Sequence, residues 1–251
     1  MSRERESTGE RRSSVLSPVR CRRDGRTAPL FDTFRYDAYP EASNESPFAV
    51  HSGSTSIDEG DYVQLMQILT DTFTGTGQPV PGSGVTTPGS VPPGGLSSTQ
   101  LQPLPVSSKR RNPPPPVVVP DGPVTIWYLE DGFETIVPIR KRGAYTGRET
   151  NTLLVPALLY GRATSNFSSD QSSQLRDALE LAYCQSAVGA FFNFQLTDES
   201  ALSGWQSGLL WADGTPKPSY RIVKQAVTAV ALGSIDCSQL PAAATGITPS
   251  G

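Results

Sequence analysis

Three short apolar runs are each followed along the chain by a helical pattern, and this alternation restricts the fold more than any other feature. The runs span residues 30–34, 124–130 and 187–196. Their aromatic and β-branched residues favour an extended backbone, so each run is predicted to form a strand. The last run is nearly continuous in apolar residues, which predicts a central strand buried on both faces.

Helical spacing of apolar residues follows each predicted strand. Ser56 and Glu59 match a capping box and predict a helix over 56–73. A second helix is expected near 168–185 and a third from Pro218 onward. The inner face of the third helix is expected to carry Tyr220, Val223, Val227 and Val230. Three successive strand–helix units predict an α/β fold, and the long loops after the strands favour part of a (β/α)8 barrel over a doubly wound sheet.

Composition divides the chain into segments of different character. Residues 1–29 are rich in arginine and lack apolar periodicity, which predicts a disordered basic arm; a misread upstream frame would look the same. Residues 75–121 are rich in proline, glycine and serine, which predicts a disordered insertion. The barrel-like part is therefore expected over 30–74 and 122–235, followed by a flexible tail over 236–251.

Charge and hydropathy limit the classes of partner. A net charge of -3 gives no signature of a nucleic-acid-binding protein, and no partner of that kind is expected. Apolar runs fall short of the roughly 20 residues that a membrane span requires, so no span is expected. The first residues do not resemble a signal peptide. The sequence gives no prediction of oligomeric state.

Cysteine and histidine usage predicts neither a metal site nor a cofactor. Cys184 and Cys237 could form a disulfide, or they could be two separate reduced thiols. His51, the only histidine, lies in a polar stretch without neighbours at metal-ligand spacing. Sequence motifs of nucleotide-binding loops, serine hydrolases and zinc proteases are missing from the 251 residues.

Polar and aromatic residues follow the predicted strands. Tyr39 comes after the first strand, Glu130 ends the second, and Phe194 with Gln195 ends the third. The carboxyl ends of parallel strands meet at one edge, so these side chains are expected to lie together. A glutamate in that position can act as the nucleophile of a glycosidase, although a solvated or salt-bridged glutamate has the same spacing.

Several segments together resemble a known family. These are "FDTFRYDAYPE", "IWYLEDG", "KRGAYTGRE", "AFFNFQLTDE" and "GWQSGLLWADGTPKPSY". They resemble the C-terminal portion of bacterial (β/α)8-barrel glycoside hydrolases of the cellulase-like retaining superfamily. The resemblance implies the last three β/α units, with Glu130 as nucleophile, an oligo- or polysaccharide partner and a secreted protein. The residues expected to contact the sugar are Tyr39, Phe194, Gln195, Trp205 and Trp211; the two tryptophans could equally be structural cover.

The resemblance also implies a missing partner for Glu130. In the family the acid/base glutamate follows an asparagine on an earlier strand, and Glu45 in "SNES" lies at the wrong place for that role. A glycoside hydrolase-like protein with little activity of its own is therefore expected. Two alternatives stay open: a non-catalytic carbohydrate- or cell-wall-binding protein that uses Phe194, Trp205 and Trp211, and the unstable product of a defective reading frame.

Overall fold

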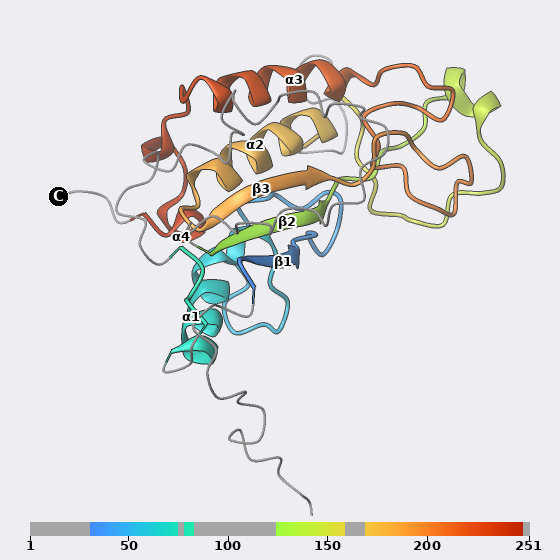
Figure 1. Cartoon of the computed structure of the whole chain (residues 1–251). Helices are drawn as coiled ribbons and strands as arrows, with labels where there is room; N and C mark the ends of the chain where they lie inside the picture. Colours follow the sequence, from blue (N-terminus) through green and yellow to red (C-terminus); the bar gives the residue numbers. More distant parts are fainter. Residues whose placement is uncertain (1–30, 75–77, 83–123, 159–168, 248–251) are drawn as a thin grey trace, which may run out of the picture.

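The molecule is a mixed α/β structure built on a small parallel sheet (Figure 1). The computed structural model describes residues 31–74, 78–82, 124–158 and 169–247. The sheet consists of β1 (Thr33–Asp37), β2 (Thr125–Asp131) and β3 (Val188–Asn193), in the order β1-β2-β3 with both pairings parallel. Within the described ranges the sheet is open, so the alternation of strands and helices is confirmed and closure into a barrel is not.

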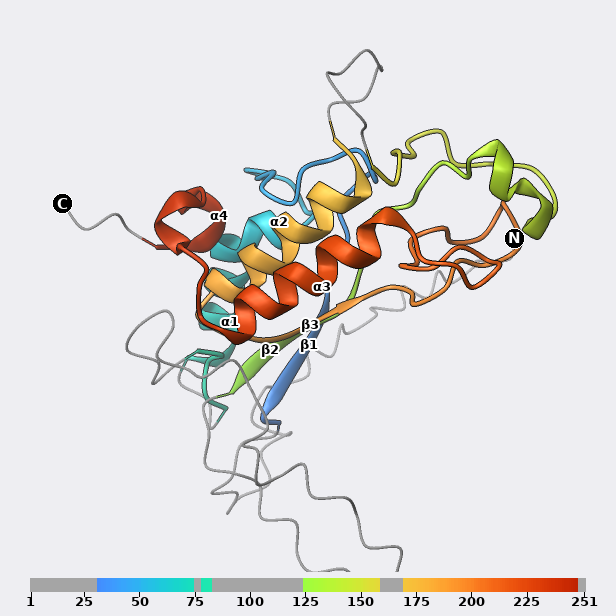
Figure 2. The same cartoon turned by 90° about the horizontal axis from the view of Figure 1, so that it is seen from above.

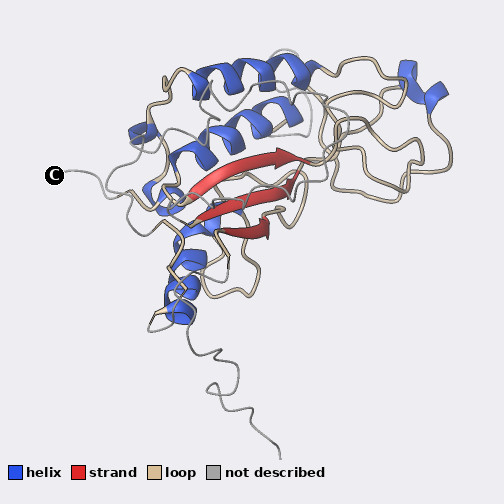
Figure 3. Ribbon diagram, in the orientation of Figure 1, coloured by secondary structure: helices blue, strands red, loops and turns tan. Residues whose placement is uncertain are grey.

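Helices follow each strand as the apolar spacing predicted (Figure 3). They are α1 (Tyr62–Phe73), which continues from the 3-10 turn η2 (Glu59–Asp61), α2 (Gln171–Cys184), α3 (Pro218–Ala231) and the short α4 (Ala242–Thr245). The first cap differs from the predicted Ser56–Glu59 box. Asp58 and Asp61 form the capping box instead, because Asp58 is the N-cap residue and Asp61 therefore occupies the third position after it.

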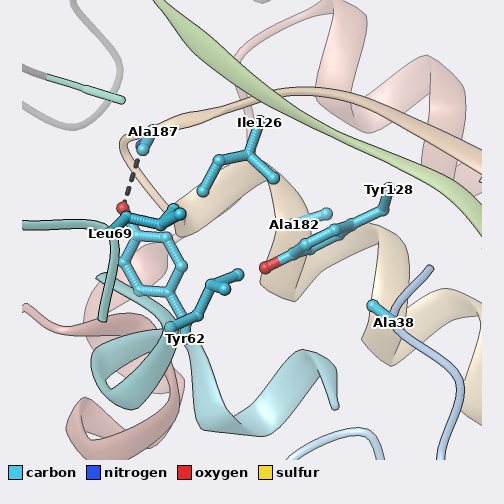
Figure 4. Packing of buried hydrophobic residues seen from close by; sticks show 8 residues of the cluster. Ala38, Tyr62, Leu69, Ile126, Tyr128, Ala182 and Ala187 are labelled. Atoms are coloured by element: carbon cyan, nitrogen blue, oxygen red, sulfur yellow. Dashed lines mark hydrogen bonds between the residues drawn. The ribbon is translucent and has the colours of Figure 1, made fainter. Parts of the chain in front are cut away.

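The helices cover one face of the sheet, and the main core lies between them and the strands (Figure 4). Ile126 and Tyr128 point into this core, where α1 contributes Leu65 and Leu69. The hydroxyl of Tyr62 accepts a hydrogen bond of 2.9 Å from the backbone N–H of Ala187, which ties α1 to the start of β3. Side chains at the intervening positions of each strand point to the other face of the sheet, away from the helices.

The opposite face of the sheet is exposed in the described part of the chain. Trp127 of β2 is 39% exposed and Phe192 of β3 is 45% exposed, and their rings lie 5.9 Å apart. The prediction that the run 187–196 is buried on both faces is therefore wrong for the described structure. The physical reason is that the described helices pack on one side only.

Helix α3 packs on α2, and the two helices lie side by side (Figure 2). Pro218 occupies its first turn as predicted. The predicted inner face is wrong for Tyr220 and Val227, which are exposed, whereas Ser219 and Ala226 are buried. Small side chains at this contact let the two helices lie close, and the Ser219 hydroxyl donates a 2.7 Å hydrogen bond to Gln171 of α2.

Residues 236–247 pack onto the fold, which corrects the predicted flexible tail. Cys184 at the end of α2 forms a disulfide with Cys237. The side chain of Gln185 donates to the carbonyl of Ala244 over 3.0 Å, and Ala244 is buried. Covalent and polar contacts, rather than apolar periodicity, therefore hold this segment.

The predicted insertion is also shorter than 75–121. Gln78 donates to and accepts from the backbone of Phe31, and the N–H of Gly82 donates to the carbonyl of Val124 over 2.8 Å. Residues 78–82 therefore belong to the folded part, while the rest of the insertion and the arm 1–29 lie outside the described residues. Among the helices that are described, none combines the length and apolarity needed to cross a bilayer.

A lobe of loops extends beyond the carboxyl ends of β2 and β3, at the right of Figure 1. It has a small core of its own, made of Val137, Tyr145, Ala157, Leu202 and Trp211. A buried ion pair joins the lobe to the start of α3, with Lys217 Nζ 2.7 Å from Asp198 Oδ1 and both side chains fully buried. The lobe is therefore a packed structure that can hold side chains in place above the strand ends.

Candidate functional site

Glu130 lies at the carboxyl end of β2, as the sequence predicted. Its side chain is about one-third exposed, and Oε1 lies 3.4 Å from the guanidinium of Arg35 on β1. The Tyr39 hydroxyl, just beyond β1, lies 3.3 Å from Glu130 Oε2. Burial and the nearby Glu130 carboxylate raise the pKa of Tyr39, so the phenol stays protonated and donates this hydrogen bond.

Three aromatic rings gather beside Glu130, and we call them the aromatic trio: Tyr39, Phe194 and Trp205. The rings of Tyr39 and Trp205 are stacked with centroids 5.4 Å apart. Phe194 contacts both edge-on, at 6.0 Å from Tyr39 and 5.6 Å from Trp205. Trp205 is 41% exposed, so part of the trio is open to a ligand. The structure thus brings together three of the residues predicted to contact a sugar.

The other two predicted contact residues lie differently. Gln195 follows Phe194 and donates a 3.1 Å hydrogen bond to Glu199. Trp211 is only 3% exposed and packs in the core of the loop lobe, with Lys217 Nζ 4.8 Å from its ring centroid. Trp211 therefore cannot stack on a sugar in this structure. Of the two roles considered for Trp211, sugar contact and a purely structural role, the structure supports the structural one.

A β-bulge near the end of β2 decides which carboxylate reaches the surface. The register of β2 against β3 shifts between Tyr128 and Asp131. Strict alternation after Ile126 and Tyr128 would turn Glu130 toward the helices. With the shift, Asp131 is buried instead and Glu130 remains accessible.

Asp131 forms a buried carboxyl pair with Glu59 of η2. Burial raises the pKa of Asp131 to about 7. Burial, and then the charge of Asp131, raise the pKa of Glu59 well above its usual value. Neither carboxyl receives a hydrogen bond from a described donor with good geometry. Burial therefore favours the protonated form of this pair, which lies at the strand end that bears Glu130.

Lys217 anchors the loop that carries Trp205. Its Nζ donates to Thr135 Oγ1 at 2.8 Å and to the carbonyl of Gln206 at 2.7 Å, in addition to its pair with Asp198. Burial lowers the pKa of Lys217 to about 8, while Asp198 opposes that shift. The Lys217 ammonium group thus fixes Gln206, the neighbour of Trp205, and helps to position the Trp205 ring in the aromatic trio.

His51 has neighbours that sequence spacing did not reveal. Its ring lies among the carboxylates of Glu45, Asp58 and Asp61, in the segment between β1 and α1. Hydrogen bonds to Asp61 and Glu45 raise the pKa of His51 to about 9. The expectation of an isolated histidine is therefore wrong, because an irregular loop brings together acids that follow no helical or strand period.

Comparisons with other proteins give no indication of what this site does. No protein-family model, curated protein or solved structure matches the chain. Function must therefore be argued from the geometry of Glu130 and the aromatic trio.

Proposed function

We propose that this chain is a glycoside hydrolase-like protein that binds an oligo- or polysaccharide at the carboxyl edge of its sheet. The observation that carries the proposal is the placement of Glu130, which is accessible and contacted by Tyr39, the residue that stacks on the exposed ring of Trp205. The three parallel strands with their helices are consistent with the last three units of a (β/α)8 barrel. In that arrangement Glu130 takes the position of the nucleophile of a retaining enzyme.

The chemistry of these groups fits a sugar ligand. Aromatic rings offer flat apolar surfaces to the C–H faces of a pyranose, and Trp205 provides one. A carboxylate beside them can attack an anomeric carbon and form a glycosyl–enzyme ester. The Tyr39 hydroxyl would fix the orientation of Glu130 during that attack, and the Arg35 guanidinium would hold the other carboxylate oxygen.

Turnover requires a second carboxyl group. A retaining glycosidase places its two carboxyls about 5 to 5.5 Å apart, one as nucleophile and one as proton donor. The polar side chains recorded against Glu130 in the described residues are Arg35 and Tyr39, and neither is an acid. Asp37 is the register partner of Glu130 across β1 and β2, but its Oδ1 contacts Arg35 Nε at 3.5 Å and no contact joins the two carboxyl groups among the described residues. We therefore expect this chain alone to bind saccharide and to hydrolyse it poorly.

The test combines a binding assay with a turnover assay. The purified chain is incubated with insoluble polysaccharides and, separately, with a panel of aryl glycosides. Retention on at least one polysaccharide with turnover near background supports the proposal. Retention on none of them, with no effect of soluble oligosaccharides on thermal unfolding, contradicts it. Rapid turnover that Glu130→Gln abolishes would show instead that the chain carries a complete catalytic site.

A non-catalytic carbohydrate-binding protein is the second candidate function, and the exposed ring of Trp205 favours it equally. The two candidates differ in their dependence on Glu130. Binding that survives Glu130→Ala and fails with Trp205→Ala supports the non-catalytic protein. Trapping of the chain by a fluorinated glycoside that forms a stable ester with Glu130 supports the hydrolase-like protein, because only a nucleophile can form that ester.

A further inference from the structure

The His51 cluster, made of Glu45, His51, Asp58 and Asp61, lies apart from the residues used above. Asp61 Oδ2 is 2.8 Å from His51 Nδ1, and Asp58 Oδ2 is 3.3 Å from the same nitrogen. Glu45 Oε1 is 3.0 Å from Nε2. The side chains of Asp58 and Asp61 are almost completely buried, and that of His51 is 16% exposed. Three carboxylates therefore surround one imidazole in a partly closed space.

The hydrogen-bond donors around His51 are too few for these carboxylates. A doubly protonated ring has two N–H groups. One faces Glu45, and the other is closest to Asp61. Asp58 Oδ1 accepts from the N–H of Gly60 at 3.2 Å. Asp58 Oδ2 is left without a hydrogen-bond donor, although the residue is only 4% exposed.

A buried carboxylate oxygen without a donor is costly unless positive charge reaches it. This oxygen points into the cluster, toward His51. Three carboxyl groups share a single imidazole ring in this cluster. The arrangement thus leaves one buried carboxylate oxygen without a hydrogen-bond donor, next to a ring nitrogen that can also serve as a metal ligand.

We propose that Glu45, His51 and Asp58 form a binding site for a divalent transition-metal ion. One ligand atom from each residue lies within 4.8 Å of the others. Two carboxylate oxygens and one imidazole nitrogen suit Mn²⁺ or Zn²⁺, whereas Mg²⁺ seldom takes a nitrogen ligand. Two carboxylates and a neutral imidazole also match the charge of a dication. Asp61 accepts from the backbone N–H of His51 at 2.6 Å and holds the loop that presents the ring.

The ligands come from two segments that are already fixed, which favours binding. Near Glu45, the carbonyl of Ser43 accepts a hydrogen bond of 2.9 Å from Gln174 of α2. Asp58 is the N-cap of η2, directly before α1. An ion at this site would therefore join the loop after β1 to the start of α1. Its effect would be structural, and it would stabilise the segment that leads away from Tyr39.

The test uses Mn²⁺ as the probe, because Cys thiolates do not favour it and Cys21 therefore does not compete. The full chain is purified without a histidine tag, stripped with a chelator and titrated with Mn²⁺ at several pH values, because protons compete with the metal ion for the ligands. Bound Mn²⁺ is followed by loss of the electron paramagnetic resonance signal of the free aqueous ion. We expect one ion per chain, displacement by Zn²⁺, and a rise in Tm on binding.

Substitutions decide whether the ion occupies this cluster. Asp58→Asn and His51→Ala should each weaken Mn²⁺ binding at least about tenfold. Asp71→Asn is the matched control, because it makes the same chemical change on the exposed face of α1 and should leave binding unchanged. If Asp58→Asn fails to fold, Glu45→Gln takes its place, since that side chain is 22% exposed. Absence of saturable binding, or binding that these cluster variants leave intact, would overturn the proposal.

Discussion

The Tyr39 hydroxyl lies 3.3 Å from Glu130 Oε2 and so joins the segment after β1 to the end of β2. The same tyrosine stacks on Trp205, which comes from the loop after β3. Tyr39 thereby links segments at the carboxyl ends of all three strands.

Trp205→Ala should weaken saccharide binding, because it removes the exposed ring of the aromatic trio. The expected loss is about 1 kcal/mol or more of binding free energy, measured by affinity electrophoresis or by retention on polysaccharide. Trp127→Ala is the control, since Trp127 is 39% exposed against 41% for Trp205 but lies on the open sheet face. Equal losses for both variants would mean that binding is a general property of exposed aromatic rings.

Lys217→Met should strongly destabilise the fold. It leaves the carboxylate of Asp198 buried without its partner 2.7 Å away, and the expected cost is about 3 to 5 kcal/mol in the free energy of unfolding. Lys141→Met removes the partly exposed pair with Asp213, also 2.7 Å, and should cost much less, because water screens that pair. Urea denaturation of both variants measures the difference. Similar costs for the two variants would show that burial does not increase the contribution of the Lys217–Asp198 pair to the free energy of unfolding.

The buried pair of Asp131 and Glu59 predicts a stability that falls as pH rises. The pKa of Asp131 is about 7 in the folded chain and about 3.9 when unfolded. Between these values the folded chain binds the proton and the unfolded chain does not, so protonation favours folding. The stability is largest toward pH 4 and is lost as pH rises through 7. Glu59, whose pKa is also raised, acts in the same direction.

Asp131→Asn tests this pH dependence. The variant cannot ionise, so its free energy of unfolding should vary less with pH, by on the order of 3 kcal/mol between pH 4 and pH 8. It should be more stable than the parent chain at pH 8. Asp71→Asn should keep the parent's pH profile. Parallel profiles for the parent and Asp131→Asn, measured by urea denaturation, would mean that Asp131 titrates normally.

Reduction of the disulfide should destabilise the C-terminal part of the fold. The bond between Cys184 and Cys237 closes a loop with a sequence separation of 53. Loop-closure entropy then predicts a loss of about 2 to 4 kcal/mol in the free energy of unfolding when the bond is removed. Cys237→Ser should unfold at lower urea concentration than the parent chain, and a reductant should shift only the parent. A parent chain that shows no cooperative transition at all would favour the reading of an unstable product.

Strands and helices could be predicted from the sequence because their periods are local. The run at 124–130 contains alternating buried and exposed residues of β2, and Pro218 marks the start of α3 in both sequence and structure. The inner face of α3 could not be predicted the same way. It packs on another helix through Ser219 and Ala226, and hydropathy favours larger residues for a buried face.

The candidate site was predictable only in part. The place of Glu130 at the end of an apolar run predicts its position in the site. Its accessibility, however, depends on the bulge that turns Asp131 inward, and the residue pattern does not predict that bulge. Trp205 and Trp211 look alike in sequence and end in different surroundings. The neighbours of His51 are brought to it by irregular backbone, where spacing along the chain carries no information about direction.

Strand order in the sheet equals strand order in the chain, and this has a consequence for synthesis on the ribosome. No strand has to insert between two that are already paired, because each one adds to the edge left by its predecessor. The apolar face of α1 with Leu65 and Leu69 is nevertheless made long before Ile126 and Tyr128, its partners in the core. During translation of the intervening residues that face lacks its strand partners, and it can be covered by them only once β2 has emerged.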